Sequence, residues 1–126
     1  NEATAWIDDT PPKENIRLAL QSGPVLIENG IVRKLQLKND EPARRIVLTI
    51  TDDERIVFLV FFDNNSRYSG PYLEDLPQVV KLSGEKFNLT IADALNLDGG
   101  TASAFYSGDI SLSEATYVGS YFCVGR

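Results

Sequence analysis

The chain has 126 residues, a length typical of one domain and sufficient to bury a hydrophobic core without disulfides. Its net charge is −6, from 18 acidic and 12 basic residues, and the basic residues are scattered apart from two short pairs. No basic stripe is present to neutralise phosphates, so the composition argues against a nucleic-acid-binding protein. No apolar run reaches the ~18 residues that a membrane-spanning helix needs.

Histidine is absent, which removes Ser-His-Asp and Cys-His nucleophilic catalysis and every zinc site built on histidine. Acid–base chemistry must then come from carboxylates, lysine or tyrosine. A calcium or magnesium site made of carboxylates and water remains allowed, but no metal-ligand set and no cofactor is predicted. The single cysteine, Cys123, lies in the apolar run "SYFCVG", and we expect it to be a buried small hydrophobic residue.

The first part of the chain is polar and contains two adjacent prolines, which predicts an extended arm or loop at residues 1–15. Beyond it, short apolar and alternating segments predict strands. The Asn29-Gly30 pair between two of them is a strong signal for a β-hairpin. The apolar segment "RIVFLVFF" is typical of a central strand that is buried on both faces. The strands expected in this half of the chain lie at residues 16–21, 25–28, 31–37, 45–51 and 55–62.

From Tyr72 onward the apolar residues fall near helical spacing, which predicts one main helix at about residues 73–83. Pro77 is compatible with this helix because the first four helical N–H groups have no partner within the helix, and Gly84 suits a C-terminal cap. Strands followed by one helix and more strands, without an alternating βα repeat, predict an α+β fold. We expect a mixed or largely antiparallel sheet in a single domain. The later strands are expected at residues 94–97, 102–106 and 116–124.

The segment "ALNLDGGTAS" at residues 94–103 has two interpretations. On local grounds, an Asp98-Gly99 pair between apolar runs is typical of a hairpin turn, in which glycine supplies a positive φ angle. Two features favour a binding site instead. Asn96 interrupts a strand with an amide that needs hydrogen-bond partners if it is buried. The successive glycines let a ligand approach the backbone closely, and their N–H groups can form a concavity that binds anions.

The wider segment "ADALNLDGGTASAF" resembles the "ALNLDGGGSS" signature of the phosphodiester glycosidase family. Three other segments resemble that family in the same order: "ALQSGPVLIENG", "ARRIVLTITDDERIVFLVFFD" and "SGPYLEDLPQVVKLSG". Together they cover roughly residues 19–107. The resemblance implies a hydrolase that cleaves the phosphodiester between a sugar's anomeric carbon and a phosphate, without a cofactor. Its ligand would be a sugar phosphate or a polysaccharide, and bacterial members of the family are associated with exopolysaccharides.

Transferred to this chain, the resemblance makes Asp98 the candidate catalytic residue, an acid–base or substrate-binding carboxylate. Arg45 matches an arginine of the family's hairpin, and a guanidinium suits bidentate phosphate binding. Asn96 would orient Asp98, while Ser103 could donate a hydrogen bond. The paired glycines would offer N–H groups or simple clearance. The implied substrate-binding residues are Arg45, Asn96, Gly99, Gly100, Ser103, Gln21 and Gly23.

Each of these residues also has an ordinary structural explanation. Arg45 could be a solvated strand residue paired with Asp52 or Asp53. Ser103 could be an ordinary strand serine. Gln21 and Gly23 could have no role beyond shaping a turn.

A glycosidase normally uses two carboxylates that flank the scissile bond, and Asp63 and Asp93 are the possible partners of Asp98. The chain departs from the signature at Thr101, where a third glycine is usual, and at Ala102, where a serine is usual. Two alternatives to an enzyme therefore stay open. One is a non-catalytic module that binds carbohydrates or phosphoglycans, and the other is an interaction domain in which "LDGG" is only a turn.

The family also carries an upstream "N-G-G-F-F"-like segment, and residues 1–18 contain nothing similar. We therefore expect the chain to be the C-terminal portion or a shortened form of the family's domain, with a missing N-terminal segment as one partner. The resemblance also implies an extracytoplasmic location, secreted or periplasmic. We expect neither a nucleic-acid partner nor a membrane span.

Overall fold

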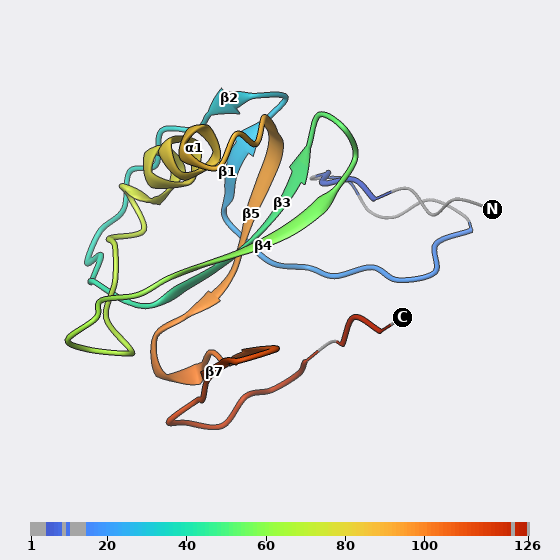
Figure 1. Cartoon of the computed structure of the whole chain (residues 1–126). Helices are drawn as coiled ribbons and strands as arrows, with labels where there is room; N and C mark the ends of the chain where they lie inside the picture. Colours follow the sequence, from blue (N-terminus) through green and yellow to red (C-terminus); the bar gives the residue numbers. More distant parts are fainter. Residues whose placement is uncertain (1–4, 9, 11–14, 122, 126) are drawn as a thin grey trace.

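The computed structural model describes residues 5–8, 10, 15–121 and 123–125. They form a five-stranded sheet, one helix and a separate two-stranded ribbon (Figure 1). The elements are β1 (Val25–Glu28), β2 (Ile31–Val32), β3 (Arg45–Thr51), β4 (Ile56–Phe61), α1 (Leu76–Lys86), β5 (Ile91–Gly99), the 3-10 turn η1 (Gly100–Ala102), β6 (Phe105–Ser107) and β7 (Ile110–Leu112).

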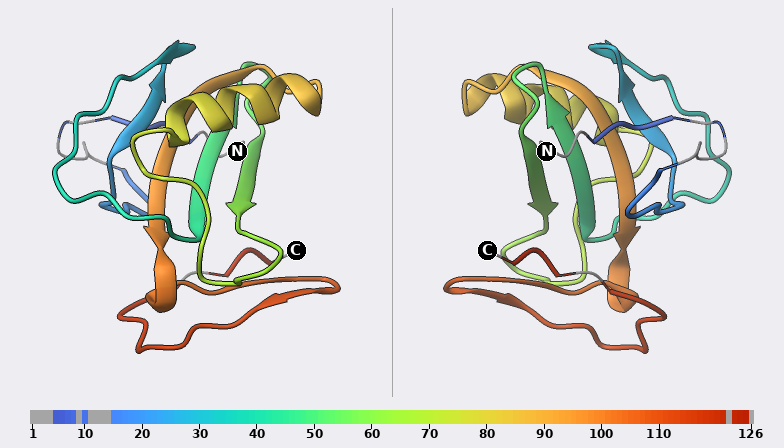
Figure 2. Two further views of the ribbon diagram at one scale, coloured as in Figure 1. Left: turned by 90° about the vertical axis from the view of Figure 1, so that its left-hand side faces the viewer. Right: turned by 90° about the vertical axis from the view of Figure 1, so that its right-hand side faces the viewer.

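The main sheet has the strand order β2-β1-β5-β3-β4, and every neighbouring pair in it is antiparallel. Among the strands of this sheet, the nine-residue β5 comes last in the chain but lies in the centre. The helix α1 covers one face, and the β6–β7 ribbon lies beyond one end of the strands (Figure 2). This confirms the predicted α+β fold with one main helix and an antiparallel sheet.

The hydrophobic core lies between α1 and the sheet. Gly84 of α1 faces β5 so closely that a Cβ atom on it would be 2.8 Å from Cδ1 of Ile91. This glycine therefore serves close packing of the helix and the sheet. It is not the expected C-terminal cap, because the helix continues to Lys86. The buried members of this core are Leu26, Ile27, Val47, Leu76, Val80, Ile91 and Ala94.

The helix begins at Leu76 and ends at Lys86, so it starts and stops three residues later than the predicted range of 73–83. Pro77 lies in its first turn, as expected from the unpaired N–H groups there. The shift arises because the backbone N–H groups of Leu73 and Glu74 donate to the Asp40 carboxylate instead of entering the helix.

The Asn29-Gly30 hairpin is confirmed, with positive φ angles of 50° and 75° at the two turn residues. β1 and β3 have the predicted bounds. The prediction of a central strand at 55–62 is wrong, because β4 is an edge strand and its residues are only partly buried. The long-range insertion of β5 beside β3 moves β4 to the edge, and no local pattern encodes that insertion.

Other expected strands are shortened or absent. Within the described residues no strand forms at 16–21 or 116–124, and the segment 31–37 keeps only β2. The strand expected at 102–106 is replaced by η1 and β6. Cys123 is exposed, not buried as predicted, because the segment around it packs into no sheet. Part of the predicted arm (1–4, 9 and 11–14) lies outside the described residues, and the described part of it has no helix or strand.

Arg44, directly before β3, fastens the chain beyond β5 to the end of the sheet. Its side chain is fully buried. Nε donates to Oγ of Ser103 at 2.9 Å, and Nη2 donates to the carbonyls of Ser103 and Ser113. Nη1 donates to the carbonyl of Arg67 at 3.2 Å, and the guanidinium lies 5.0 Å from the centre of the Tyr68 ring. Burial lowers the pKa of Arg44, and no carboxylate of the described chain lies within ion-pair distance of it.

Replacement of Arg44 by lysine should lower the free energy of unfolding by about 3 kcal/mol. A single ammonium cannot reach the acceptors that the planar guanidinium spans, so buried carbonyls lose their partners. Urea denaturation measures the change. The control is Arg55→Lys, because Arg55 forms an exposed pair with Asp53 and should change stability by less than about 0.5 kcal/mol. Equal stabilities of the two variants would contradict the role of Arg44 in holding the chain beyond β5 against the sheet.

Candidate functional site

The predicted site residues gather at one end of the main sheet, where β5 ends and β3 begins. In the register of these strands Arg45 lies opposite Gly99, and Ile46 lies opposite Asp98. On the other flank of β5, Oγ of Ser22 donates to the carbonyls of Asn96 and Leu97 at 2.8 and 2.6 Å. The segment 21–24 therefore runs beside the motif. This brings Gln21 and Gly23 to one side of β5 and Arg45 to the other.

Asn96 is the buried amide of the motif, with 6% of its surface exposed. Its backbone N–H donates to the carbonyl of Pro24 at 3.0 Å, and Nδ2 donates to the carbonyl of Gly23 at 3.1 Å. These bonds hold the segment before β1 against β5. Oδ1 of Asn96 is buried and has no hydrogen-bond partner in the described part of the chain. The amide thus holds Gly23 in place, and within the described residues it forms no hydrogen bond with Asp98.

Asp98 follows a β-bulge. Val47 pairs with Asn96 and Ile46 pairs with Asp98, so Leu97 is the extra residue on β5. A bulge locally twists a strand and re-aims the side chains after it. Asp98 is exposed, and its Oδ1 accepts the N–H of Gly99 at 2.7 Å. The hairpin-turn interpretation of this segment is wrong, because β5 continues through Gly99 and η1 follows directly.

The two glycines provide clearance. A Cβ atom on Gly99 would lie 2.5 Å from the carbonyl oxygen of Arg44, and 3.2 and 3.3 Å from Cδ and Nη1 of Arg45. Gly100 has a φ of 65°, which favours glycine, and its N–H donates to the Arg44 carbonyl at 2.8 Å. The N–H of Gly99 is already bound to Asp98. Both N–H groups are therefore used within the protein, and clearance is the role that the geometry favours.

Arg45 lies against Gly99 and is held by three oxygen atoms. Nη2 donates to the carbonyl of Glu41 at 2.8 Å and pairs with Oδ1 of Asp40 at 3.4 Å, and Nε donates to the carbonyl of Pro71 at 3.3 Å. The side chains of Arg45 and Asp40 are each only 12% exposed. Nη1 has no hydrogen-bond partner in the described part of the chain, so one edge of the guanidinium stays available.

The acidic partner of Arg45 is thus Asp40, not Asp52 or Asp53 from the following turn. The Asp40 carboxylate also accepts the N–H groups of Leu73 and Glu74 at 3.1 and 2.8 Å. Its burial acts to raise the pKa, but these N–H groups and the charge of Arg45 outweigh burial and hold the pKa of Asp40 below its ordinary value. Asp40 therefore joins β3 to the segment that leads into α1.

Arg45 and Asp98 point to opposite faces of the sheet. Arg45 pairs with Gly99, and the next residue of β3, Ile46, pairs with Asp98. Paired residues share a face and successive residues of a strand alternate between faces, so Arg45 and Asp98 lie on different faces. Arg45 lies on the face covered by α1, since its partner Asp40 binds the backbone just before that helix. The two groups therefore bracket Gly99 at the end of the sheet and do not face each other across one cleft.

Ser103 is buried, with 2% of its surface exposed. Its hydroxyl donates to the carbonyl of Gly100 at 2.8 Å and accepts Nε of Arg44. In this arrangement Ser103 supports Arg44. Sequence reasoning had not singled out Arg44. The available signal was the adjacent Arg44-Arg45 pair at the start of a strand, where alternation sends the two side chains to opposite faces.

Neither possible second carboxylate lies beside Asp98. Asp93 is five residues earlier on β5, roughly 17 Å away at the usual rise per residue, and its Oδ1 accepts the N–H of Asn29. Asp63 lies two strands across from Asp98 and three residues further along. The corresponding backbone separation is roughly 14 Å. Carboxylate pairs in glycosidases are roughly 5 to 9.5 Å apart, so neither Asp63 nor Asp93 forms such a pair with Asp98.

The described residues contain no group of three or more acidic or cysteine side chains that could hold a metal ion. Within the same residues, no helix is long and apolar enough to cross a membrane.

A family model described as phosphodiester glycosidase matches residues 2–124 of the chain. The chain belongs to this family. No curated protein and no solved structure matches it. Membership of the phosphodiester glycosidase family confirms the resemblance seen in the four sequence segments, and it points to a substrate that contains a sugar. The family's signature occupies the end of β5, where the exposed Asp98 precedes the two glycines.

Replacement of Gly99 by alanine should lower the free energy of unfolding by about 2 kcal/mol, because the new methyl group would overlap the Arg44 carbonyl oxygen. The matched control is Gly23→Ala, since nothing lies within 4 Å of a Cβ atom placed there. We expect the control to change stability by less than about 0.5 kcal/mol. Chemical denaturation compares the two, and a neutral Gly99→Ala variant would contradict the close approach.

Replacement of Asp40 by asparagine should lower the melting temperature at neutral pH, because Arg45 loses its charged partner. The folded pKa of Asp40 is depressed, so its stabilisation is fully present above the ordinary carboxyl value of about 3.9 and is lost as the pH falls through the folded pKa. The difference between the native and variant proteins should therefore shrink below about pH 4. Asp75→Asn is the control, because Asp75 forms no side-chain cap on α1. A difference that is constant with pH would contradict this role of Asp40.

Proposed function

We propose that the chain hydrolyses a sugar-phosphate phosphodiester at the end of β5. The observation that carries this proposal is the exposed Asp98 carboxylate, directly before two residues without side chains, in a chain that matches the phosphodiester glycosidase family. An enzyme of this kind would break the bond between the anomeric carbon of the sugar and the phosphate oxygen. An extracytoplasmic location and an exopolysaccharide-related substrate are part of the same proposal.

One carboxylate is sufficient for this chemistry. The leaving group is a phosphate monoester, whose second pKa is about 6, so it departs readily without being protonated. In an ordinary glycoside the leaving group is an alkoxide, which needs a general acid. Asp98 then serves as the general base for water. The water oxygen bonds to the anomeric carbon, the carbon–oxygen bond breaks, and the phosphate takes its electron pair. The proton of the water passes to Asp98 and then to solvent.

Arg45 would compensate for the charge of the phosphate. Its Nη1 atom lies beside Gly99 and has no hydrogen-bond partner among the described residues. Asp98 precedes the same glycine on the opposite face, so a phosphodiester laid over the end of β5 would meet both groups. Gln21 and the backbone at Gly23, on the other flank of the strand, would supply polar contacts to the sugar.

A non-catalytic module that binds phosphoglycans is the second candidate. It is favoured by the isolation of Asp98 from Asp63 and Asp93, and by the engagement of Ser103 with Arg44. In this case the end of β5 would keep its affinity for a sugar phosphate without turnover.

The test is release of reducing sugar from a sugar-1-phosphodiester. Asp98→Asn should lower kcat at least about 100-fold, the usual effect of a lost general base, with the dissociation constant changed little. The control is Asp109→Asn in the exposed turn between β6 and β7. In ¹⁸O-labelled water the label should enter the sugar and not the phosphate. Absence of turnover by the intact chain would contradict the enzyme, and retained binding would then support the module.

A further inference from the structure

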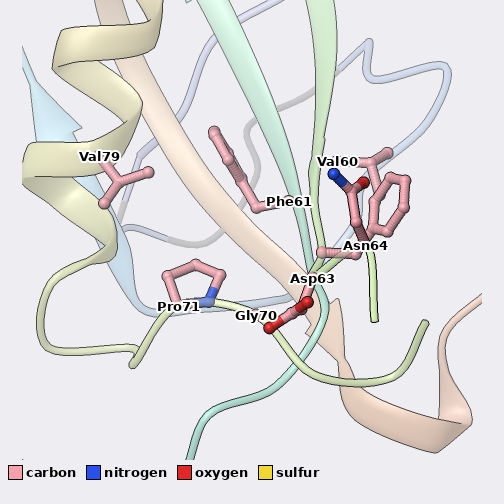
Figure 3. A pocket seen from close by; sticks show the side chains of 8 residues that line it. Val60, Phe61, Asp63, Asn64, Gly70, Pro71 and Val79 are labelled. Atoms are coloured by element: carbon pink, nitrogen blue, oxygen red, sulfur yellow. The ribbon is translucent and has the colours of Figure 1, made fainter. Parts of the chain in front are cut away.

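A groove of about 440 Å³ opens at the end of β4, next to α1. Binding sites for small molecules typically measure about 300 to 1,000 Å³, so the groove is large enough for one sugar ring. Figure 3 shows Phe61, Pro71 and Val79 around a common space, with Asp63 beside Gly70 at its lower end. No candidate residue of the β5 motif lines this groove.

The walls of the groove are apolar. Phe61 comes from β4, Phe62 follows it, Val79 comes from α1, and Pro71 comes from the loop between them. Phe62 is 42% exposed, so its ring offers surface to a ligand. Aromatic and proline rings pack well against the flat face of a pyranose, which presents C–H groups. A wall of this kind favours a ring-shaped ligand with an apolar face.

The polar group that faces these walls is the carboxylate of Asp63, whereas Figure 3 shows the Asn64 side chain directed away from Phe61 and Pro71. Oδ1 of Asp63 accepts the N–H of Asn65 at 2.7 Å, and this bond orients the carboxylate. The other carboxylate oxygen has no hydrogen-bond partner in the described part of the chain. A carboxylate accepts hydrogen bonds from hydroxyl groups. The negative charge of Asp63 disfavours a phosphate here, so the matching ligand is neutral and rich in hydroxyl groups.

The groove is continuous with Arg45. Phe61 lies directly opposite Arg45 in the β3–β4 ladder, so the two side chains share one face of the sheet. Pro71, a wall of the groove, accepts Nε of Arg45 through its carbonyl oxygen at 3.3 Å. A single ligand can therefore place a neutral ring against Phe61 and a negative group near Arg45.

We propose that this groove is a binding subsite for a second, neutral pyranose ring of the substrate, across the phosphate from the sugar beside Gln21 and Gly23, with Asp63 as its specificity-determining residue. The proposal rests on the proposed function for the identity of the ligand, but the subsite can bind a sugar without turnover. It gives Asp63 a role in recognition that agrees with its distance from Asp98. The phosphate then lies at Arg45, outside the acidic groove.

The test is a set of ¹⁵N–¹H correlation spectra of the full chain. Methyl α-D-glucopyranoside is the neutral probe, inorganic phosphate is the anionic probe, and glucose 1-phosphate combines both. The neutral probe should shift the amide signals of Phe62, Asp63, Asn64 and Gly70. Inorganic phosphate should shift those of Arg45 and Gly99. Glucose 1-phosphate should shift both groups of signals and bind more tightly than either part.

Two substitutions in the groove should weaken binding of the neutral probe. Phe62→Ala removes the exposed ring, and Asp63→Asn removes the charge but keeps an oxygen for the Asn65 N–H. Each should raise the dissociation constant about fivefold or more, as for a lost stacking or hydrogen-bonding partner. The controls are Phe87→Ala and Asp109→Asn, two exposed residues outside the groove, which should leave binding unchanged. Folding of every variant is checked in the same spectra.

The subsite would be overturned if the neutral probe shifts no groove signal, or shifts only signals around Asp98 and Gly23. It would also be overturned if the control substitutions weaken binding as much as Phe62→Ala does. Turnover that depends on Asp98 in the absence of groove shifts would leave the proposed function standing and remove the subsite. Groove shifts without turnover would keep the subsite and remove the proposed hydrolysis.

Discussion

The close approach of β3 to the end of β5 is the constraint on which the rest of the structure depends. The Arg44 carbonyl accepts the N–H of Gly100 at 2.8 Å and occupies the space where a side chain on Gly99 would lie. Only glycine permits this contact, since a Cβ atom would be 2.5 Å from the oxygen. The contact ends β5, starts η1 and directs the chain beneath the sheet. It also leaves the Asp98 side chain exposed near the end of the β3–β5 pairing.

The two arginines at the start of β3 have different electrostatic surroundings. Because successive side chains of a strand point to opposite faces, Arg44 and Arg45 lie on different faces of the sheet. The positive charge of each is compensated in a different way. Arg44 is surrounded by backbone carbonyls and by the Tyr68 ring, whereas Arg45 pairs with Asp40. A buried cation held only by dipoles stabilises local structure and is inaccessible to a ligand. The partly exposed Arg45, whose Nη1 atom has no partner within the part of the chain that the structure describes, is the better place for an anion.

Local patterns predicted what depends on local structure. The hairpin at Asn29-Gly30, the bounds of β1 and β3 and the existence of α1 follow from turn chemistry and periodicity, and all are present. The edge position of β4 follows from the pairing of β5 with β3, whose paired residues are 40 or more positions apart in the sequence. The motif was located by its residues, but the opposite faces of Arg45 and Asp98 depend on the bulge at Leu97. Such a register cannot be obtained from one strand alone.

The arrangement separates recognition of the substrate from its cleavage. A phosphate leaving group has a low proton affinity, so it requires charge compensation more than it requires an acid. That need is met by an arginine, and only one carboxylate then has to lie near the anomeric carbon. A second carboxylate is free to act elsewhere, as we propose for Asp63 in the groove beside α1. The separation of Asp98 from both Asp63 and Asp93 is therefore consistent with cleavage of a sugar phosphodiester, whereas the same geometry would be poorly suited to an ordinary glycoside.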